Sequence, residues 1–264
     1  MPDDHEEWRE ELSKIFRALS PNKPDRKIVV NKESSTQLHI SAGKKKWTFG
    51  QLQKIAMAIL YFERCVDALM PDTSVQDEWC MSNHASVYYR ACEYAKEIGT
   101  NSEVDESINS AILLIRDSTK DTNNLVETMC GYPPHFRDRN YGHTVGPLFR
   151  WNFTPLIEDQ LDENDQSDPI SNIEWRQAPG SDTAAKAVSW VTFALGFIQS
   201  AIARDTDYTG AATLNALKVF VSEGVKVSGC GDPNAVDWLF DGKTDDSISK
   251  IVFRNGWFYI NSVD

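Results

Sequence analysis

The sequence lacks a run of apolar residues long enough to span a bilayer. Its most apolar stretch, residues 183–203, is interrupted by Lys186 and by several hydroxyl and amide side chains. A secretory signal also needs a basic end followed by an apolar run, whereas the first residues, MPDDHEEWREELSKIF, are acidic and amphipathic. We therefore expect a soluble, cytoplasmic protein with no membrane partner.

Basic residues are scarce relative to acidic ones. The 264 residues include 27 Lys and Arg against 39 Asp and Glu, which gives a formal net charge of −12. Proteins that bind nucleic acid gain much of their affinity from cationic side chains that neutralise phosphates. The charge balance therefore predicts no nucleic-acid partner.

Several motifs that mark common active sites and metal sites are absent. The chain has no Gly-rich phosphate loop, no Gly-x-Ser-x-Gly elbow and no His-Glu-x-x-His. Its cysteines form no Cys-x-x-Cys pair and show no regular pairing with histidine, so we expect free, mostly buried thiols and no metal site. The five cysteines are Cys65, Cys80, Cys92, Cys130 and Cys230.

What the sequence does contain is a mixture of helical and alternating patterns. No Gly-, Ser- or Pro-rich linker divides it near the middle, so we expect a single domain over residues 1–264. Apolar residues at helical spacing predict helices at 5–19, from Thr48 onward, in pieces over 84–130, at 182–202, and at 211–222 closed by Gly224. Alternating or β-branched runs predict strands at 27–31, 36–41, 149–154 and 173–177. The expected fold class is α+β.

Three of these strands place polar side chains on one face and apolar side chains on the other. The polar pairs are Gln37 and His39, Arg150 and Asn152, and Glu174 and Arg176. If the three polar faces converge, they supply a titratable imidazole, a carboxylate to orient it, and guanidinium groups that can hold an anion. Periodicity alone leaves a second interpretation open, because antiparallel sheets are commonly wet on one side. Trp151 and Trp175, on the opposite faces, are expected core residues.

Two further candidates lie outside the strands. Glu63 continues the apolar stripe of the helix that Thr48 opens, and it either reaches water at the helix edge, the favoured interpretation, or is buried with a partner. His143 belongs to the breaker-rich segment 131–147, which we expect to be a long loop. Such a loop can form a lid over a site, although exposed loop histidines are the commoner case.

The order of several short motifs resembles the fungal putative amidoligase family. The first block comprises Ser34-Ser-Thr-Gln-Leu-His-Ile-Ser, Trp47-Thr-Phe-x-Gln-Leu, Ala58-Ile-Leu-Tyr-Phe-Glu63 and Ala68-Leu-Met-Pro71. The later block comprises Arg150-Trp-Asn-Phe, Ile173-Glu-Trp-Arg-Gln-Ala-Pro-Gly and Ser189-Trp-Val-x-Phe. The resemblance covers roughly residues 30–205 and implies the carboxylate–amine ligase fold, a curved, mainly antiparallel sheet with helices on its outer face and the active site on its concave face. It places His39, Asn152, Glu174 and Arg176 among the polar motif positions.

The chain departs from that family at two points. Where the family usually has a His-x-His strand, this sequence has Gln37-Leu-His39. Relatives also begin with strands that carry a Glu-x-Glu pair, which the resemblance implies would hold magnesium and nucleotide. Here Met1 stands just before the helix that precedes the His39 strand. We therefore expect an N-terminally truncated form of the fold that lacks the ATP and magnesium half.

The favoured function is an enzyme of fungal secondary metabolism that acts on a small-molecule substrate without a cofactor, as an ATP-independent cyclase, isomerase or lyase. His39 is the expected general acid or base, and Glu174 and Arg176 complete the catalytic set. The expected substrate-binding residues are Gln37, Arg150, Asn152, Glu63 and His143. One alternative is an ATP- and magnesium-dependent amidoligase that forms a C–N bond, and another is a non-catalytic binding subunit.

Overall fold

The computed structural model describes residues 4–19, 28–31, 33–43, 45–71, 79–97, 107–133, 143–157, 171–205, 208–249, 251–254 and 257–260. The α-helices are α1 (Asp4–Leu19), α2 (Phe49–Leu69), α4 (Asn83–Glu97), α5 (Ile108–Ser118), α6 (Thr122–Met129), α8 (Ala184–Ala203), α9 (Leu214–Ser228) and α10 (Asp245–Ser249). The 3-10 helices are η2 (Thr154–Leu156) and η4 (Pro233–Phe240). The strands are β1 (Ser35–Ser41), β2 (Trp151–Asn152), β3 (Asn172–Pro179), β4 (Ile251–Arg254) and β5 (Trp257–Ile260).

The central sheet has three antiparallel strands in the order β1-β3-β2. Glu174 of β3 lies opposite His39 on one side and Asn152 on the other, and Trp175 lies opposite Leu38 and Trp151. Strands β4 and β5 form a separate antiparallel pair. With this small antiparallel sheet and its many helices, the protein is α+β, as the sequence predicted.

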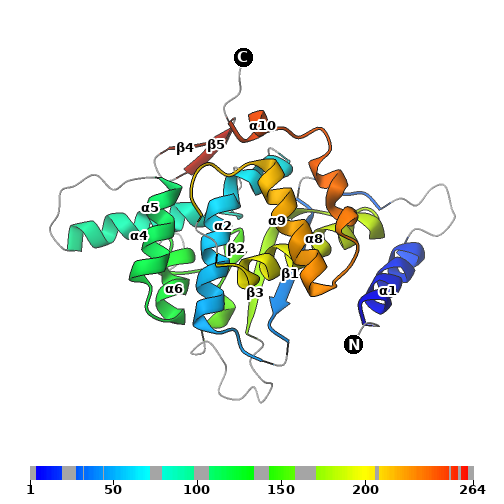
Figure 1. Ribbon diagram of the computed structural model, residues 1–264, viewed down its shortest axis with the longest axis horizontal. Helices are drawn as coiled ribbons and strands as arrows, with labels where there is room; N and C mark the ends of the chain where they lie inside the picture. Colours follow the sequence, from blue (N-terminus) through cyan, green and yellow to red (C-terminus); the bar gives the residue numbers. More distant parts are fainter. Residues whose placement is uncertain are drawn as a thin grey trace.

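An aromatic stack joins the sheet to its helices. Trp151 and Trp175 stack at 5.4 Å between ring centroids, Trp175 stacks on Phe193 of α8 at 5.4 Å, and Trp151 stacks on Phe197 at 5.5 Å. Figure 1 shows α2, α8 and α9 on one side of the sheet, with α4, α5 and α6 grouped beside α2. The two tryptophans therefore anchor the core on the helix-covered face, as predicted, and the polar residues opposite them lie on the other face.

Helix α8 is the central helix of this core. It is long and apolar enough to cross a membrane by length and composition alone, yet 61% of that apolar window is buried inside the protein. It packs closely against α9. At Gly224 of α9 the two helices are so close that an added Cβ would collide with the carbonyl oxygen of Gly196. The prediction that Gly224 closes α9 was wrong: the helix continues to Ser228, and Gly229 caps it with a φ of 64°.

The sequence predicted the start of α2 correctly. Thr48 caps the helix, since its side chain accepts a hydrogen bond from the Gln51 backbone while the Gln51 side chain accepts one from the Thr48 backbone. The cysteines are also as predicted, because none of the five forms a disulfide and four are buried.

One predicted strand is absent from the structure, and another is shorter than predicted. Residues 28–31 form no strand, because the chain turns at Asn31, whose side chain accepts from the Glu33 backbone. The strand expected over 149–154 is reduced to β2. The Arg150 carbonyl still accepts a hydrogen bond from the Arg176 backbone of β3, but the Arg150 N–H donates to Met81, and η2 begins at Thr154. The short length of β2 decides where the Arg150 side chain lies.

Candidate functional site

Glu174 is the centre of a polar cluster on the face of the sheet opposite the tryptophans. Its Oε2 accepts a hydrogen bond from Asn152 Nδ2 at 2.9 Å, and the Nη1 of Arg176 lies 3.5 Å from its carboxylate. The Glu174 side chain is 8% exposed, whereas that of Arg176 is 20% exposed. A buried carboxylate is costly unless donors compensate it, and these two side chains supply that compensation.

The orientation of Asn152 follows from the turn that begins η2. Its Oδ1 accepts hydrogen bonds from the backbone and the hydroxyl of Thr154, at 2.9 and 2.8 Å. The amide nitrogen is therefore left to face Glu174. Asn152 is 2% exposed, so it acts on Glu174 and does not meet solvent.

His39 lies on the edge strand β1, directly across from Glu174. Its Nε2 is 3.9 Å from Glu174 Oε1, within ion-pair range, and its Nδ1 is 3.2 Å from Asn172 Oδ1. The imidazole is 58% exposed, unlike the carboxylate behind it. Each ring nitrogen thus faces a different polar neighbour, while the ring itself is accessible to a molecule from solution.

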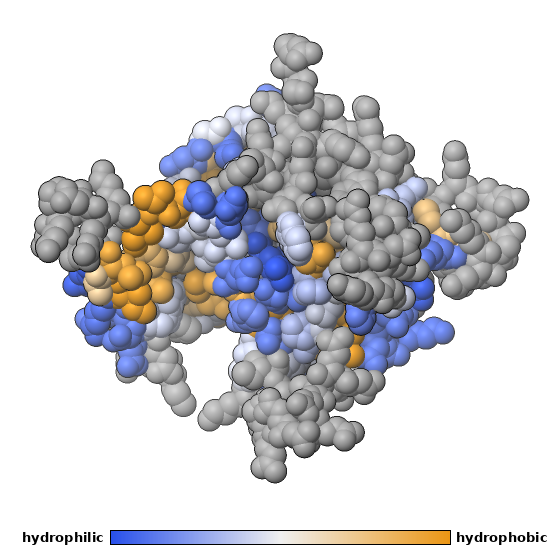
Figure 2. Space-filling view, turned by 180° about the vertical axis from the view of Figure 1, so that it is seen from behind, coloured by the Kyte–Doolittle hydropathy of each residue, from blue (hydrophilic) through white to orange (hydrophobic). Residues whose placement is uncertain are grey.

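Gln37 shares the exposed face of β1 with His39. The burial pattern of the strand alternates. The register shifts between Thr36 and Leu38, which marks a bulge in β3, where Arg176 and Gln177 together lie opposite Gln37. Figure 2 looks at the molecule from behind and shows hydrophilic residues gathered near the centre of that side. The structure thus brings together His39, Glu174, Arg176 and Asn152, with Gln37 two residues along the same strand.

Arg150 lies elsewhere, and its predicted place beside Asn152 was wrong. Its Nη1 is 2.9 Å from Glu63 and 3.0 Å from Asp67, both on α2, and its side chain is 1% exposed. Because Arg150 precedes the two-residue strand β2, the alternation that places Asn152 does not extend to it. A buried guanidinium with two carboxylate partners cannot contact a substrate at the surface.

Glu63 is buried, so the expectation that it reaches water was wrong. Besides Arg150, it accepts hydrogen bonds from the Ser82 hydroxyl and from the backbone of Asn83 and His84, at 2.9 to 3.1 Å. It therefore binds the first backbone N–H groups of α4, where a carboxylate is electrostatically favoured. Its partners come from segments 20 and 87 residues away, which explains why helical spacing alone did not reveal them.

Asp67 completes this internal network. Its Oδ1 accepts a hydrogen bond from Gln177 Nε2 at 2.5 Å, which ties α2 to β3. Burial raises the pKa of Asp67 to about 7, although Arg150 acts in the opposite direction. The network comprises the carboxylates of Glu63 and Asp67 and the guanidinium of Arg150, and it links α2 to the sheet.

His143 is exposed in the stretch that leads toward β2, and no contact between it and the Glu174 cluster is found among the described residues. Within the ranges that the structure describes, no group of three or more His, Cys, Asp and Glu side chains is placed to hold a metal ion.

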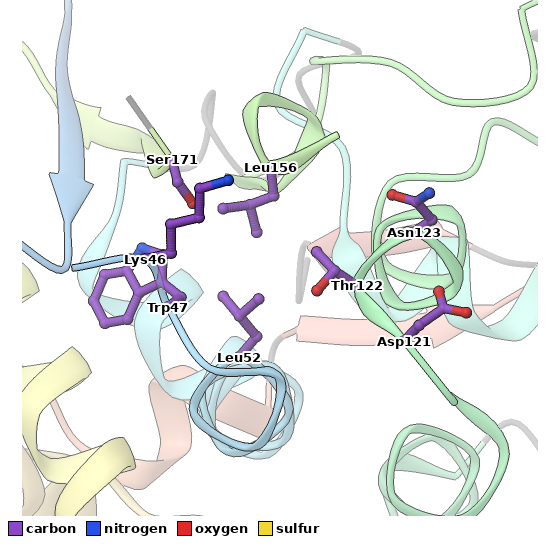
Figure 3. Close-up of a pocket in the computed structure, with 8 residues that line it drawn as sticks. All are labelled: Lys46, Trp47, Leu52, Asp121, Thr122, Asn123, Leu156 and Ser171. Atoms are coloured by element: carbon purple, nitrogen blue, oxygen red, sulfur yellow. The ribbon is translucent and has the colours of Figure 1, made fainter. Parts of the chain in front are cut away.

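A cavity of about 320 Å³ lies beside the end of β1 and the start of β3 (Figure 3). Sequence reasoning missed it, because its lining comes from segments that are far apart in the chain and show no shared motif. The lining residues are Lys46, Trp47, Leu52, Asp121, Thr122, Asn123, Leu156 and Ser171. Ser171 directly precedes Asn172, the residue that contacts His39, so the cavity adjoins the polar cluster through the chain.

Comparisons with models of protein families, with curated protein sequences and with solved structures found no match to this chain.

Proposed function

We propose that this protein is an enzyme that moves a proton on a small organic molecule, as an ATP-independent cyclase, isomerase or lyase. The observation that carries the proposal is the pairing of an exposed imidazole, His39, with a buried carboxylate, Glu174, across β1 and β3. These reaction classes need an acid or base at a fixed place, together with a group that stabilises developing negative charge.

His39 has the chemistry and the position for the acid–base role. Imidazole is the side chain whose charge changes most readily near neutral pH. The 58% exposed ring can meet a substrate, whereas Glu174 can act only on the ring, because it is 8% exposed and lies 3.9 Å from Nε2. Glu174 is thus a positioning residue that orients the ring.

Arg176 and Gln37 are the proposed substrate contacts. The guanidinium of Arg176 is 20% exposed beside Glu174, where it can stabilise an enolate or a carboxylate. Gln37 is exposed on the same strand face as His39 and offers a neutral amide. Asn152 is assigned to holding Glu174, and Arg150 and Glu63 are assigned to the internal network.

The resemblance of the sequence motifs to the fungal putative amidoligase family supports two further parts of the proposal. One is that the sheet is a remnant of the carboxylate–amine ligase fold, and the other is that the substrate belongs to secondary metabolism. The order β1-β3-β2, with His39, Glu174 and Asn152 in register across it, is compatible with a polar sheet face of that kind.

A comparison of metabolites tests this function. Cells that produce the wild-type chain should convert a small molecule that accumulates in cells without it, and the purified protein should convert it without added ATP. Conversion that requires ATP and magnesium, with binding of both in a calorimetric titration, would instead identify a ligase. If no metabolite differs between the two cultures and purified protein binds none of them, the non-catalytic interpretation holds and the proposal fails.

A further inference from the structure

Helix α1 carries an apolar stripe that the rest of the chain covers only in part. The stripe repeats at spacings of four, three and four residues, as in the seam of a coiled coil, and consists of Trp8, Leu12, Ile15 and Leu19. From Glu7 onward no residue of α1 is buried, and the hydrophobic core that the structure describes includes none of its side chains. Ile15 and Leu19 are 52% and 60% exposed. A single chain therefore leaves much of this stripe in contact with solvent.

A polar contact on one side of the stripe attaches α1 to the rest of the protein. The Nη2 of Arg9 donates to the carbonyl oxygen of Cys230 at 2.8 Å. Ile15 lies six positions further along the helix, about 120° around its axis from Arg9, and so projects away from this contact. Figure 2 shows hydrophobic residues gathered over α1 at the left edge of the molecule, on the side that faces away in Figure 1.

The exposed charges of α1 are divided between its two halves. The first half carries three exposed carboxylates, those of Glu7, Glu10 and Glu11. Residues 12–19 contain two exposed cations, Lys14 and Arg17, and no acidic residue. A parallel copy of this helix would place like charges side by side, whereas an antiparallel copy places the acidic half of each helix alongside the basic half of the other.

We propose that α1 is a dimerisation surface that packs against α1 of a second copy of this chain, antiparallel about a two-fold axis. The register that best matches the stripe to itself sets Trp8 opposite Leu19 and Leu12 opposite Ile15. Glu11 and Lys14 lie on the same flank of the stripe, so each meets the opposite charge of the other copy there. The stripe and the charge division together carry the proposal, and neither depends on the proposed function.

The length of α1 limits the strength of this dimer. A helix of 16 residues extends about 24 Å, so a pair of them buries less than the roughly 1,600 Å² of a standard interface. We therefore expect a reversible dimer that dissociates on dilution. The acidic half also disfavours an anionic bilayer as the occupant, because helices that lie on such surfaces have basic polar faces.

Sedimentation equilibrium of the full chain, with a reducing agent to keep its cysteines as thiols, tests the proposal over about 1 to 500 µM. The wild type should pass from monomer to dimer within this range. Ile15→Glu should weaken dimerisation about tenfold or more, because it places a carboxylate in the apolar contact. The matched control is Val219→Glu, at a β-branched residue of α9 that is 45% exposed, and it should dimerise like wild type.

Two charge reversals test the antiparallel pairing of opposite charges. Glu11→Lys makes the flank of the stripe basic and Lys14→Glu makes it acidic, and each variant alone should dimerise more weakly than wild type. Both break the same exposed pair within α1, which spans 2.7 Å. An equimolar mixture should regain dimers, because the two flanks are then complementary. Circular dichroism at the lowest concentration reports whether each variant is folded.

Three results would overturn the proposal. They are a wild-type chain that stays monomeric over the whole range, equal dimerisation by folded Ile15→Glu and wild-type proteins, and a mixture of the two charge variants that forms no more dimer than either alone. Vesicles of phosphatidylcholine and phosphatidylglycerol serve as a further probe. If the wild type is monomeric and binds them more tightly than Ile15→Glu does, the stripe contacts lipid and the assignment to a second copy is wrong.

Discussion

The Nη1 of Arg150 lies 2.9 Å from the Oε1 of Glu63, and both side chains are almost completely buried. This ion pair fixes the segment before β2 against α2. Because β2 carries Asn152, the same contact helps to set the position of the amide that holds Glu174. The internal network and the proposed site are therefore linked through three consecutive residues of the chain.

Removal of the guanidinium should be strongly destabilising. Arg150→Met leaves Glu63 and Asp67 buried without their cation, so unfolding in urea should show a loss of about 3 to 5 kcal/mol. The control is Arg116→Met, because Arg116 is 52% exposed and pairs with the exposed Asp117. It should cost about 0.5 kcal/mol or less. Equal losses in the two variants would show that the network contributes no more than a surface pair.

Stability should depend on pH through Asp67. Its pKa is about 7 in the folded protein, against 3.8 as the ordinary value, so between about pH 4 and 7 the native state holds a proton that the unfolded chain has released. Stability from this group therefore rises as pH falls from 7, by at most about 1.4 kcal/mol per pH unit. Asp67→Asn removes this dependence, while the amide oxygen of the substituted side chain can still accept from Gln177.

The measurement is the difference in unfolding free energy between wild type and Asp67→Asn at a series of pH values. Above about pH 8 the difference should be constant, and below 7 it should shift in favour of the wild type. A difference that does not change between pH 8 and 5 would contradict the assignment of a raised pKa.

Gly224 should be required for the contact between α8 and α9. A methyl group there would meet the carbonyl of Gly196, so Gly224→Ala should force the helices apart and destabilise the protein by about 1 to 3 kcal/mol or more. Gly50→Ala is the matched control, since a methyl group meets nothing within 4 Å at that position in the first turn of α2. It should leave stability unchanged or raise it by up to about 1 kcal/mol. Thermal unfolding of the two variants gives the comparison.

Local patterns predicted much of the fold. The period of two placed His39 and Glu174 on polar strand faces and Trp175 on the opposite face, because alternation holds along β1 and the first half of β3. The capping box at Thr48 located the start of α2 because its two residues, Thr48 and Gln51, are close together in the sequence. The register that sets His39 opposite Glu174 could not be derived, because it depends on pairing between segments more than a hundred residues apart.

The errors at Arg150 and Glu63 have the same origin. Each side chain is fixed by a charged partner 87 residues away, and neither strand nor helix periodicity contains that information. The cavity at Lys46 and Trp47 was missed because helices α2 and α6 approach it only in three dimensions. Sequence patterns thus predicted which residues share a face, whereas long-range pairing decided which faces meet.

The most direct test of the account compares two substitutions on β1 in the metabolite assay. His39→Gln removes the imidazole from an exposed position, so the folded state should persist while the rate of conversion falls by about a hundredfold or more. Ser35→Ala, at the exposed start of the same strand, should retain the wild-type rate. A folded His39→Gln protein that converts the metabolite as fast as Ser35→Ala would contradict the proposed role of His39.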